Sequence, residues 1–224
     1  HNNCAFWCNP CYLIVMPIVI NGSGSITGLS VGGLPDGSVA LADLATTGTA
    51  SSSTFLRGDG AFAEAGGGKF ASYALIADHK SSGTPGGTFV SGDWRTRDLN
   101  TEVADADGIV SISSNQFTLQ AGTYLIKWKC PVYGRDYNQS RLYNITDSSV
   151  VGNGGSMYSW YNGNVSNTSD GQARVTISGA KVFELQHRTS QSSSGENTAF
   201  GVKVGNSFTV TTEVYSQCEI YKES

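Results

Sequence analysis

A chain of 224 residues is long enough for one large domain, or for one domain preceded by an extended segment. Its composition is 39% hydrophobic and only 14% charged, with 28 glycines, which is typical of many short strands joined by polar turns. The net charge is −4 and Lys and Arg form no block, so we expect no nucleic-acid partner, because binding phosphates requires concentrated positive charge.

The first segment, residues 1–15, places three cysteines in the spacing C-x3-C-x2-C. This spacing holds iron–sulfur clusters in radical enzymes that cleave S-adenosylmethionine, but no alternating strand–helix pattern follows it here. A zinc site would need a fourth ligand, for which His1 is the nearby residue. The apolar run YLIVMPIVI is too short to span a bilayer, so we expect no membrane insertion. We interpret Met16 as the natural start and residues 1–15 as an upstream extension.

Residues 16–68 are rich in Gly, Ser, Thr and Ala and contain only short apolar islands. Such islands cannot build a core of their own, which indicates an extended N-terminal shaft or attachment segment. The sequence AEAGGGK at 63–69 looks like a flexible joint, because glycine leaves the backbone free. We therefore predict a domain boundary between residues 68 and 69.

Within this segment, residues 53–64 read STFLRGDGAFAE and contain Arg57-Gly58-Asp59, a tripeptide best known as an animal cell-adhesion signal. Asp59-Gly60 is also a strong tight-turn signal between two short apolar segments. We predict a short hairpin at 53–64, in which Arg57 and Asp59 shape the turn or contact a neighbouring chain.

From residue 69 to residue 224, strand signals recur with turn residues between them, and helical periodicity is absent. In GTYLIKWKCPV one face carries the alternating residues Tyr124, Ile126, Trp128, Cys130 and Val132. In the last strand the corresponding residues are Phe208, Val210, Val214, Cys218 and Ile220. Both later cysteines are therefore predicted to lie in the core. This pattern predicts an all-β fold for 69–224, most simply an antiparallel jelly-roll sandwich.

The stretch from Phe117 to Trp128 resembles the signature of the complement-subunit and tumour-necrosis-factor-like jelly rolls. That signature runs Phe, a short turn, then G-x-Y-x-F-x-aromatic, and here Ile126 replaces the usual Phe. The resemblance extends over about residues 70–222. It implies the jelly-roll fold and a homotrimer.

The sequence from Tyr73 to Ile126 resembles a version of this domain found in bacteriophage structural proteins, notably tail fibres and related appendages. The small-residue lead-in MPIVINGSGSITGLSVGGLPDGSV and the module STFLRGDGAFAEAG are similar to parts of phage fibres. This resemblance implies a virion protein whose N-terminal segment contacts other virion proteins and whose jelly roll lies at the tip. Three identical sites would then bind a bacterial surface glycan with high avidity.

Sugar recognition relies on exposed aromatic planes with amides and charges around them. Two loop regions offer such residues, and the candidates are Arg135, Asp136, Tyr137, Asn138, Tyr158, Trp160, Tyr161 and Asn162. The alternative is that the Tyr and Trp side chains pack within the sandwich or at a trimer interface.

Two further motifs have structural alternatives. Asp105 and Asp107 in DADG are spaced like the first ligands of a calcium loop, but the later acidic ligands are missing, so a plain Asp-Gly turn is the simpler interpretation. WRTRDLNTEV groups residues that suggest a structural ion-pair cluster: Trp94, Arg95, Arg97, Asp98 and Glu102.

The three histidines are isolated, and no catalytic motif such as G-x-S-x-G or H-E-x-x-H occurs. We therefore expect a protein that is not an enzyme and has no catalytic residues or cofactor. Two alternatives remain open. One is a virion decoration or trimerising assembly cap without a ligand, and the other is a glycan depolymerase with a carboxylate pair.

Overall fold

The computed structural model describes residues 46–64, 68–134, 136–160, 165–192, 199–205, 207 and 209–224. The chain divides into two compact units, residues 1–65 and 66–224, whereas the sequence places the boundary at 68/69. The described residues form thirteen strands and no helix. Accordingly, no helix in this part of the chain is long and apolar enough to cross a bilayer. The cysteines and His1 of residues 1–15 lie outside the described residues.

The first unit contains a hairpin made of β1 (Thr54–Leu56) and β2 (Phe62–Glu64). In its turn the Arg57 N–H donates to the Ala61 carbonyl at 2.9 Å, and Gly60 has a φ of 81°, which glycine adopts without strain. The Asp59 carboxylate accepts from the Ala61 N–H at 3.1 Å and lies 3.6 Å from the exposed Arg57 guanidinium. The adhesion-like tripeptide therefore forms the turn of this hairpin.

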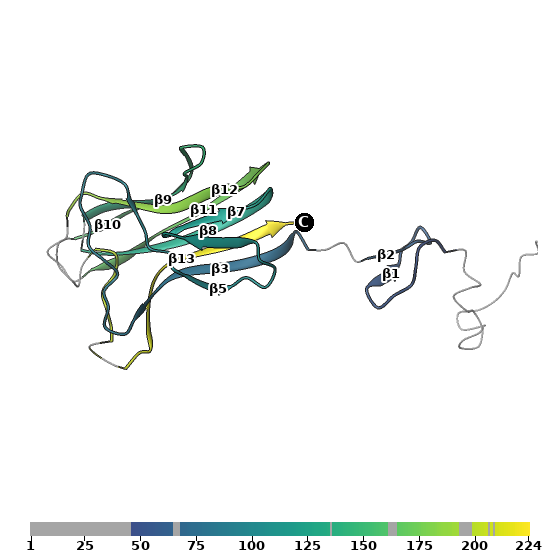
Figure 1. The fold of residues 1–224 in the computed structure, drawn as a ribbon, viewed down its shortest axis with the longest axis horizontal. Helices are drawn as coiled ribbons and strands as arrows, with labels where there is room; N and C mark the ends of the chain where they lie inside the picture. The colour runs from purple at the N-terminus through teal and green to yellow at the C-terminus, as the bar shows by residue number, and fades with distance from the viewer. Residues whose placement is uncertain are drawn as a thin grey trace, which may run out of the picture. The chain divides into compact units, whose positions relative to one another are not determined.

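Residues 66–224 form a sandwich of two antiparallel sheets (Figure 1). The five-stranded sheet has the order β11 (Ser166–Ile177), β8 (Gly122–Tyr133), β13 (Thr212–Glu223), β3 (Phe70–Ser81) and β5 (Thr101–Ala104). The six-stranded sheet has the order β10 (Ser149–Ser159), β9 (Asp136–Asn144), β12 (Lys181–Thr189), β7 (Gln116–Leu119) and β6 (Val110–Ser113), with β4 (Arg95–Thr96) paired to β12. The all-β jelly-roll prediction is confirmed.

The core lies between the sheets, and Trp128 occupies its centre. All five alternating residues predicted on β8 are buried, as are the thiols of Cys130 and Cys218. The Trp128 indole Nε1 donates to the Ser140 hydroxyl on the opposite sheet at 2.9 Å. Gly171 on β11 faces the same indole, and a Cβ at this position would overlap the ring. A small residue at 171 is therefore what lets the largest core side chain lie flat against β11.

The alternation predicted for the last strand is wrong at its start. Val214 is 46% exposed, whereas Cys218 and Ile220 are fully buried. The pairing of β13 with β3 shifts register between Val214 and Gln217, which indicates a β-bulge. Because the side-chain period is two, one extra residue reverses the faces on its two sides.

The segment AFGVKV at 199–204 is not a strand, although its apolar residues suggested one. It is held by a bridge between Ala199 and Tyr133, by backbone hydrogen bonds to Gly86 and Gly87, and at Val204 and Gly205 by the carboxylate of Glu213 on β13. This buried carboxylate accepts from the backbone N–H groups of Gly83, Val204 and Gly205 at 2.8–3.1 Å. Burial alone would raise the pKa of Glu213, but the three N–H donors outweigh it and lower the pKa.

Within the sandwich, the chain enters and leaves at the same end. The Ser224 N–H donates to the Lys69 carbonyl at 3.2 Å. The first residue of β9 and the last residues of β8, β10 and β12 lie at the opposite end, as Figure 1 shows. We call this the loop end, and it is where the candidate residues of the sequence are found.

Prediction for the core. Gly171→Ala places a methyl group against the Trp128 ring and should destabilise the fold by about 1–3 kcal/mol, the usual range for overpacking. Gly179→Ala is the control, because no atom lies within 4 Å of its added methyl group, and it should change stability by less than about 0.5 kcal/mol. Urea denaturation of both variants measures the difference. Equal midpoints would contradict the packing described for Trp128.

Candidate functional site

Two of the predicted aromatic residues form an exposed pair at the loop end. Tyr137 on β9 lies directly opposite Tyr158 on β10, and their ring centroids are 4.9 Å apart. Their side chains are 71% and 53% exposed, and Trp160, just beyond β10, is 56% exposed. These rings therefore lie on the surface of the isolated chain, which leaves them free for a ligand or a neighbouring chain.

Backbone hydrogen bonds hold Tyr137 at a defined position. Its N–H donates to the Ser190 hydroxyl at 3.2 Å, and its carbonyl accepts from the Ser190 N–H at 2.9 Å. The chain reaches β9 through Gly134 and Asp136, which have φ values of 55° and 54°. This tight entry directs the Tyr137 ring away from the core.

A groove of about 540 Å³ runs beside this tyrosine on the outer face of the six-stranded sheet. Its described lining consists of Ser91, Gly92, Trp94, Tyr137, Asn138, Gln139, Ser156, Met157, Arg188, Thr189 and Ser190. Register places Gln139 opposite both Arg188 on β12 and Ser156 on β10. A guanidinium, an amide and a hydroxyl thus form one polar row across three strands.

Trp94 forms an aromatic part of this lining, and a cation fixes its orientation. The Arg141 guanidinium lies 4.0 Å from the Trp94 ring centroid and 4.8 Å from that of Tyr143. The Arg141 Nε also donates to Gln186 at 2.6 Å. Burial lowers the pKa of Arg141; Tyr143 and the carboxylate of Glu184 oppose this effect, and the charge of Arg188 adds to it.

The ion-pair cluster expected around Trp94 is not formed by the residues that the sequence grouped together. Arg95 lies 3.7 Å from Asp93, and Asp98 is 2.6 Å from Lys80. Arg97 is fully buried instead of lying on the indole face. Sequence proximity was misleading because β4 ends at Thr96, and the chain then turns inward.

Arg97 holds the loop end together from inside. Its two terminal nitrogens donate to the carbonyls of Pro131 at 2.8 Å and Phe200 at 2.9 Å. The guanidinium also lies 4.0 Å from the Phe200 ring centroid, and its Nη1 is 3.4 Å from His187 Nδ1. One buried cation thus connects β8, the 199–205 segment and β12.

His187 connects the buried Arg97 to the groove residue Asn138. Its Nε2 lies 3.1 Å from the Asn138 amide oxygen, and Arg97 can only donate to Nδ1, so the neutral imidazole with its proton on Nε2 satisfies both contacts. Burial, and then the charge of Arg97, lower the pKa of His187 well below its usual range. Asn138 is itself buried, and its amide nitrogen donates to the Asp136 carbonyl at 3.2 Å. Asn138 therefore supports Tyr137 from beneath.

The other predicted site residues have different outcomes. Arg135, Tyr161 and Asn162 lie outside the described residues. Sequence reasoning missed Gln139 and Arg188 as groove residues, and it assigned Trp94 to another cluster. Their signal was the polar alternation of β9 and β12, which becomes informative only once these strands are known to be neighbours.

The calcium candidates lie in a tight turn. Both carboxylate oxygens of Asp105 accept backbone N–H groups, from Ile109 and Val110, each at 2.9 Å. Asp107 is exposed on the same turn. Within the described ranges, no group of three or more His, Cys, Asp or Glu residues is placed to hold a metal ion.

A second surface of interest is the outer face of the five-stranded sheet. Phe70 and Tyr73 lie 5.3 and 5.0 Å from the Tyr221 ring centroid, and they are 39% and 38% exposed. Leu125 lies opposite Tyr221 on β8. We call these four residues the aromatic face. The Tyr221 hydroxyl donates to Glu219 at 2.7 Å, which raises the pKa of Tyr221 to about 12.

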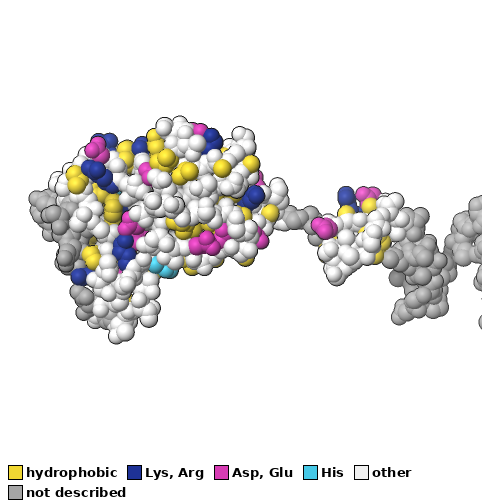
Figure 2. Space-filling model, in the orientation of Figure 1, with side chains coloured by type: hydrophobic (Ala, Val, Ile, Leu, Met, Phe, Trp, Pro, Cys, Tyr) yellow, Lys and Arg dark blue, Asp and Glu magenta, His cyan; other side chains and the backbone are white. Residues whose placement is uncertain are grey.

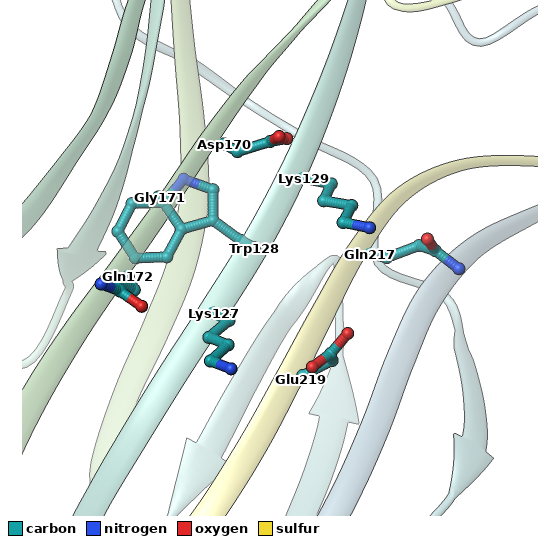
Figure 3. A pocket seen from close by; sticks show the side chains of 8 residues that line it. All are labelled: Lys127, Trp128, Lys129, Asp170, Gly171, Gln172, Gln217 and Glu219. Atoms are coloured by element: carbon teal, nitrogen blue, oxygen red, sulfur yellow. The ribbon is translucent and has the colours of Figure 1, made fainter.

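A shallow polar pocket of about 510 Å³ lies on the same sheet (Figure 3). It adjoins the aromatic face, because the Nζ of Lys127 in its lining is 5.3 Å from the Tyr221 ring centroid. Lys127 and Lys129 on β8 lie beside Glu219 and Gln217 on β13, and Asp170 on β11 completes the charged set. The two cations on β8 thus have an acidic neighbour on each flanking strand, Asp170 opposite Lys129 and Glu219 opposite Lys127. On the molecular face drawn in Figure 2, acidic and basic side chains are likewise interspersed among uncharged polar groups.

No protein-family model matches this chain, and no curated protein is similar to it in sequence. Solved structures are similar in fold. The globular domain of the zebrafish complement 1qA protein is 15% identical, with 69% of this chain and 96% of that chain covered and a TM-score of 0.39. Murine APRIL at pH 5.0 is 5% identical, with 66% and 98% covered and a TM-score of 0.43. These likenesses concern the fold alone.

Prediction for the buried histidine. Because the pKa of His187 is lowered in the native state, the unfolded chain binds the proton more readily than the folded one. The contribution of neutral His187 to the free energy of unfolding is therefore complete above about pH 6.5, the ordinary histidine pKa, and decreases as the pH falls below that value. One excluded proton contributes a slope of at most about 1.4 kcal/mol per pH unit. His187→Gln should flatten the dependence of unfolding free energy on pH between 7 and 5. Tyr137→Ala should keep the wild-type slope, and identical slopes in all three proteins would refute the neutral, buried state of His187.

Proposed function

We propose that this chain is a subunit of a homotrimeric attachment protein, whose jelly roll binds a glycan in the groove at its loop end. The observation that carries the proposal is the composition of that groove. Tyr137 provides an exposed ring and Trp94 a partly buried one, and Gln139, Ser156 and Arg188 provide polar groups in the same lining. Sugars present apolar ring faces and hydroxyl edges, so they require this combination.

The position of the groove supports an attachment role. The chain joins the sandwich at Lys69 and ends beside it at Ser224, while the groove lies at the other end. Three such sites in one trimer convert weak binding at each site into strong overall binding.

The aromatic face supports the homotrimer. Phe70, Tyr73, Leu125 and Tyr221 expose apolar surface on a sheet that already buries its other side in the core. Exposed aromatic clusters of this kind favour association with another copy, and closed symmetric assembly covers them in every subunit. The alternating charges of Lys127, Lys129 and Glu219 next to this face favour a defined register between copies.

The phage context of the proposal rests on the sequence. The FLRGDGAF module and the small-residue lead-in of 16–68 resemble parts of phage fibres and appendages. We propose that the lead-in contacts other virion proteins and that the sandwich contacts the bacterial surface. The assembled protein would then be part of the virion.

We propose binding without cleavage. Glycoside hydrolysis generally uses two carboxyl groups on either side of the bond. The described lining of the groove consists of hydroxyls, amides, apolar groups and one guanidinium, which suits recognition. A depolymerase would release reducing ends from a bound polysaccharide, and this readout distinguishes the two activities.

Prediction for glycan binding. The full-length protein should bind at least one member of a panel of bacterial surface polysaccharides. Tyr137→Ala and Trp94→Ala should each weaken binding by about tenfold per site, because each removes an aromatic ring that lines the groove. Val150→Ala is the matched control, since Val150 is exposed on the same sheet but does not line the groove, and it should bind normally. A correctly folded trimer that binds nothing on the panel would favour the structural alternative, an assembly cap without a ligand.

Prediction for assembly. Tyr73→Glu places a charge in the aromatic face and should dissociate the trimer, because a buried charge without a partner is strongly destabilising. Tyr158→Glu makes the same change on the other sheet and should leave the assembly intact. Sedimentation velocity on both variants reports the oligomeric state. A monomeric wild type, or a trimer that tolerates Tyr73→Glu, would contradict the proposed interface.

A further inference from the structure

The charge of the groove narrows the class of ligand. We infer that the groove is selective for acidic glycans and that Arg188 binds the carboxylate of a uronic-acid-type sugar. This inference rests on the proposed glycan-binding function and adds the chemical identity of the recognised group.

Arg188 is placed to bind a ligand. It occupies the last outward-facing position of β12, after Glu184 and Gln186, and its side chain is exposed. It is the one charged residue in the described lining of the groove. Trp94 and Tyr137 are in the same lining. A ligand that stacks on either ring therefore lies close to the Arg188 guanidinium.

Within the described part of the chain, no carboxylate pairs with this guanidinium. None of the ion pairs and no side-chain hydrogen bond there involves Arg188. The nearest acidic residue on its own strand face, Glu184, is already used: its Oε1 accepts from Gln186, and its Oε2 accepts from Thr96 and Gln116 at 3.1 Å. Among the described residues, the charge of Arg188 is therefore not neutralised by a carboxylate.

The local electrostatic field adds to this selectivity. The cation that interacts with Arg188 is Arg141, which is held between Trp94 and Tyr143. Two neighbouring guanidiniums repel each other, and an anion placed at Arg188 relieves that repulsion. Near the edge of the groove, the Asp93 carboxylate lies 3.7 Å from the Arg95 guanidinium. This pairing reduces the repulsion that Asp93 would exert on an anion bound at Arg188.

The geometry of the floor favours a sugar carboxylate over other anions. A guanidinium binds a carboxylate through two parallel hydrogen bonds. Gln139 lies opposite Arg188 in register; its amide nitrogen donates to the Gly154 carbonyl and the Ser156 hydroxyl, so its amide oxygen is the group that can accept from an adjacent sugar hydroxyl. In a uronic acid the carboxylate is attached directly to the ring that stacks on an aromatic side chain. Stacking on Tyr137 or Trp94 therefore brings the carboxylate to the groove floor, which a flexible phosphodiester chain does not reproduce.

The test compares acidic polysaccharides with their neutral forms on the full-length protein. The probes are polygalacturonate and hyaluronate, each in its native form and after carboxyl reduction, which converts the acid to a neutral hexose. Poly(glycerol phosphate) is a third probe that carries anionic charge without a sugar carboxylate. Wild type should bind at least one native polyuronate about tenfold or more tightly than the reduced form, as expected for a charge-assisted bidentate contact.

Substitutions at Arg188 test the assignment of the residue. Arg188→Gln should lose the preference for the acidic form, so that the native and reduced forms bind with similar affinity, and Arg188→Lys should recover part of the preference. Arg57→Gln is the matched control, since it removes the same charge from the separate hairpin, and it should behave as wild type. Circular dichroism confirms that each variant is folded.

The outcomes separate this inference from the proposed function. Equal affinity for native and reduced forms, a preference that survives Arg188→Gln, or binding of poly(glycerol phosphate) alone would each overturn the inference. So would a folded wild type that binds neither polyuronate. If neutral polysaccharides then bind in a manner that depends on Tyr137, the glycan-binding function stands and only the acidic selectivity fails.

Discussion

The buried guanidinium of Arg97 is the interaction on which the loop end depends. A cation removed from water is stabilised when its donors find acceptors, and here two carbonyls and one imidazole take the terminal nitrogens of Arg97 while the Phe200 ring packs on the guanidinium. Among the described residues, the buried Nε has no partner. Those partners come from β8, from β12 and from the 199–205 segment. Because the guanidinium is planar and its donors are fixed in direction, the three segments cannot move independently.

This constraint reaches the groove through one further pair of residues. His187 connects Arg97 to Asn138, and Asn138 lies directly after Tyr137 in the chain. The exposed ring is thus supported by a hydrogen-bonded network that begins in the core. Rigid support of this kind reduces the ordering that a ligand must impose, which matters most when each single contact is weak.

The two sheets present different outer faces, and the difference fits two tasks. The outer face of the five-stranded sheet combines the aromatic face with alternating charges, which suits contact with another copy. The outer face of the six-stranded sheet combines aromatic side chains with a row of polar groups. This row includes the Arg188 guanidinium, which has no carboxylate partner among the described residues, and the combination suits a polar ligand. Most of the groove residues lie on strands, where cross-strand pairing fixes their spacing.

The sequence by itself determined the fold class and much of the core. Alternation on β8 predicted five buried residues correctly, because a strand with one buried side must alternate with period two. The turn chemistry of Asp59-Gly60 matches the hairpin that the structure shows. These features are local, so a short stretch of residues specifies them. Tyr137, Tyr158 and Trp160 were likewise recognised as candidates from local composition.

Only the tertiary structure decided which distant residues meet. The pairing of β9 with β12 brought Gln139 to Arg188, and the inward turn after Thr96 took Arg97 away from Trp94. The bulge in β13 exposed Val214, which a strict alternation would bury. Strand order, register shifts and the burial of a charge depend on contacts between segments far apart in the chain. No local pattern records them, because each is fixed by the free energy of the whole packed sandwich.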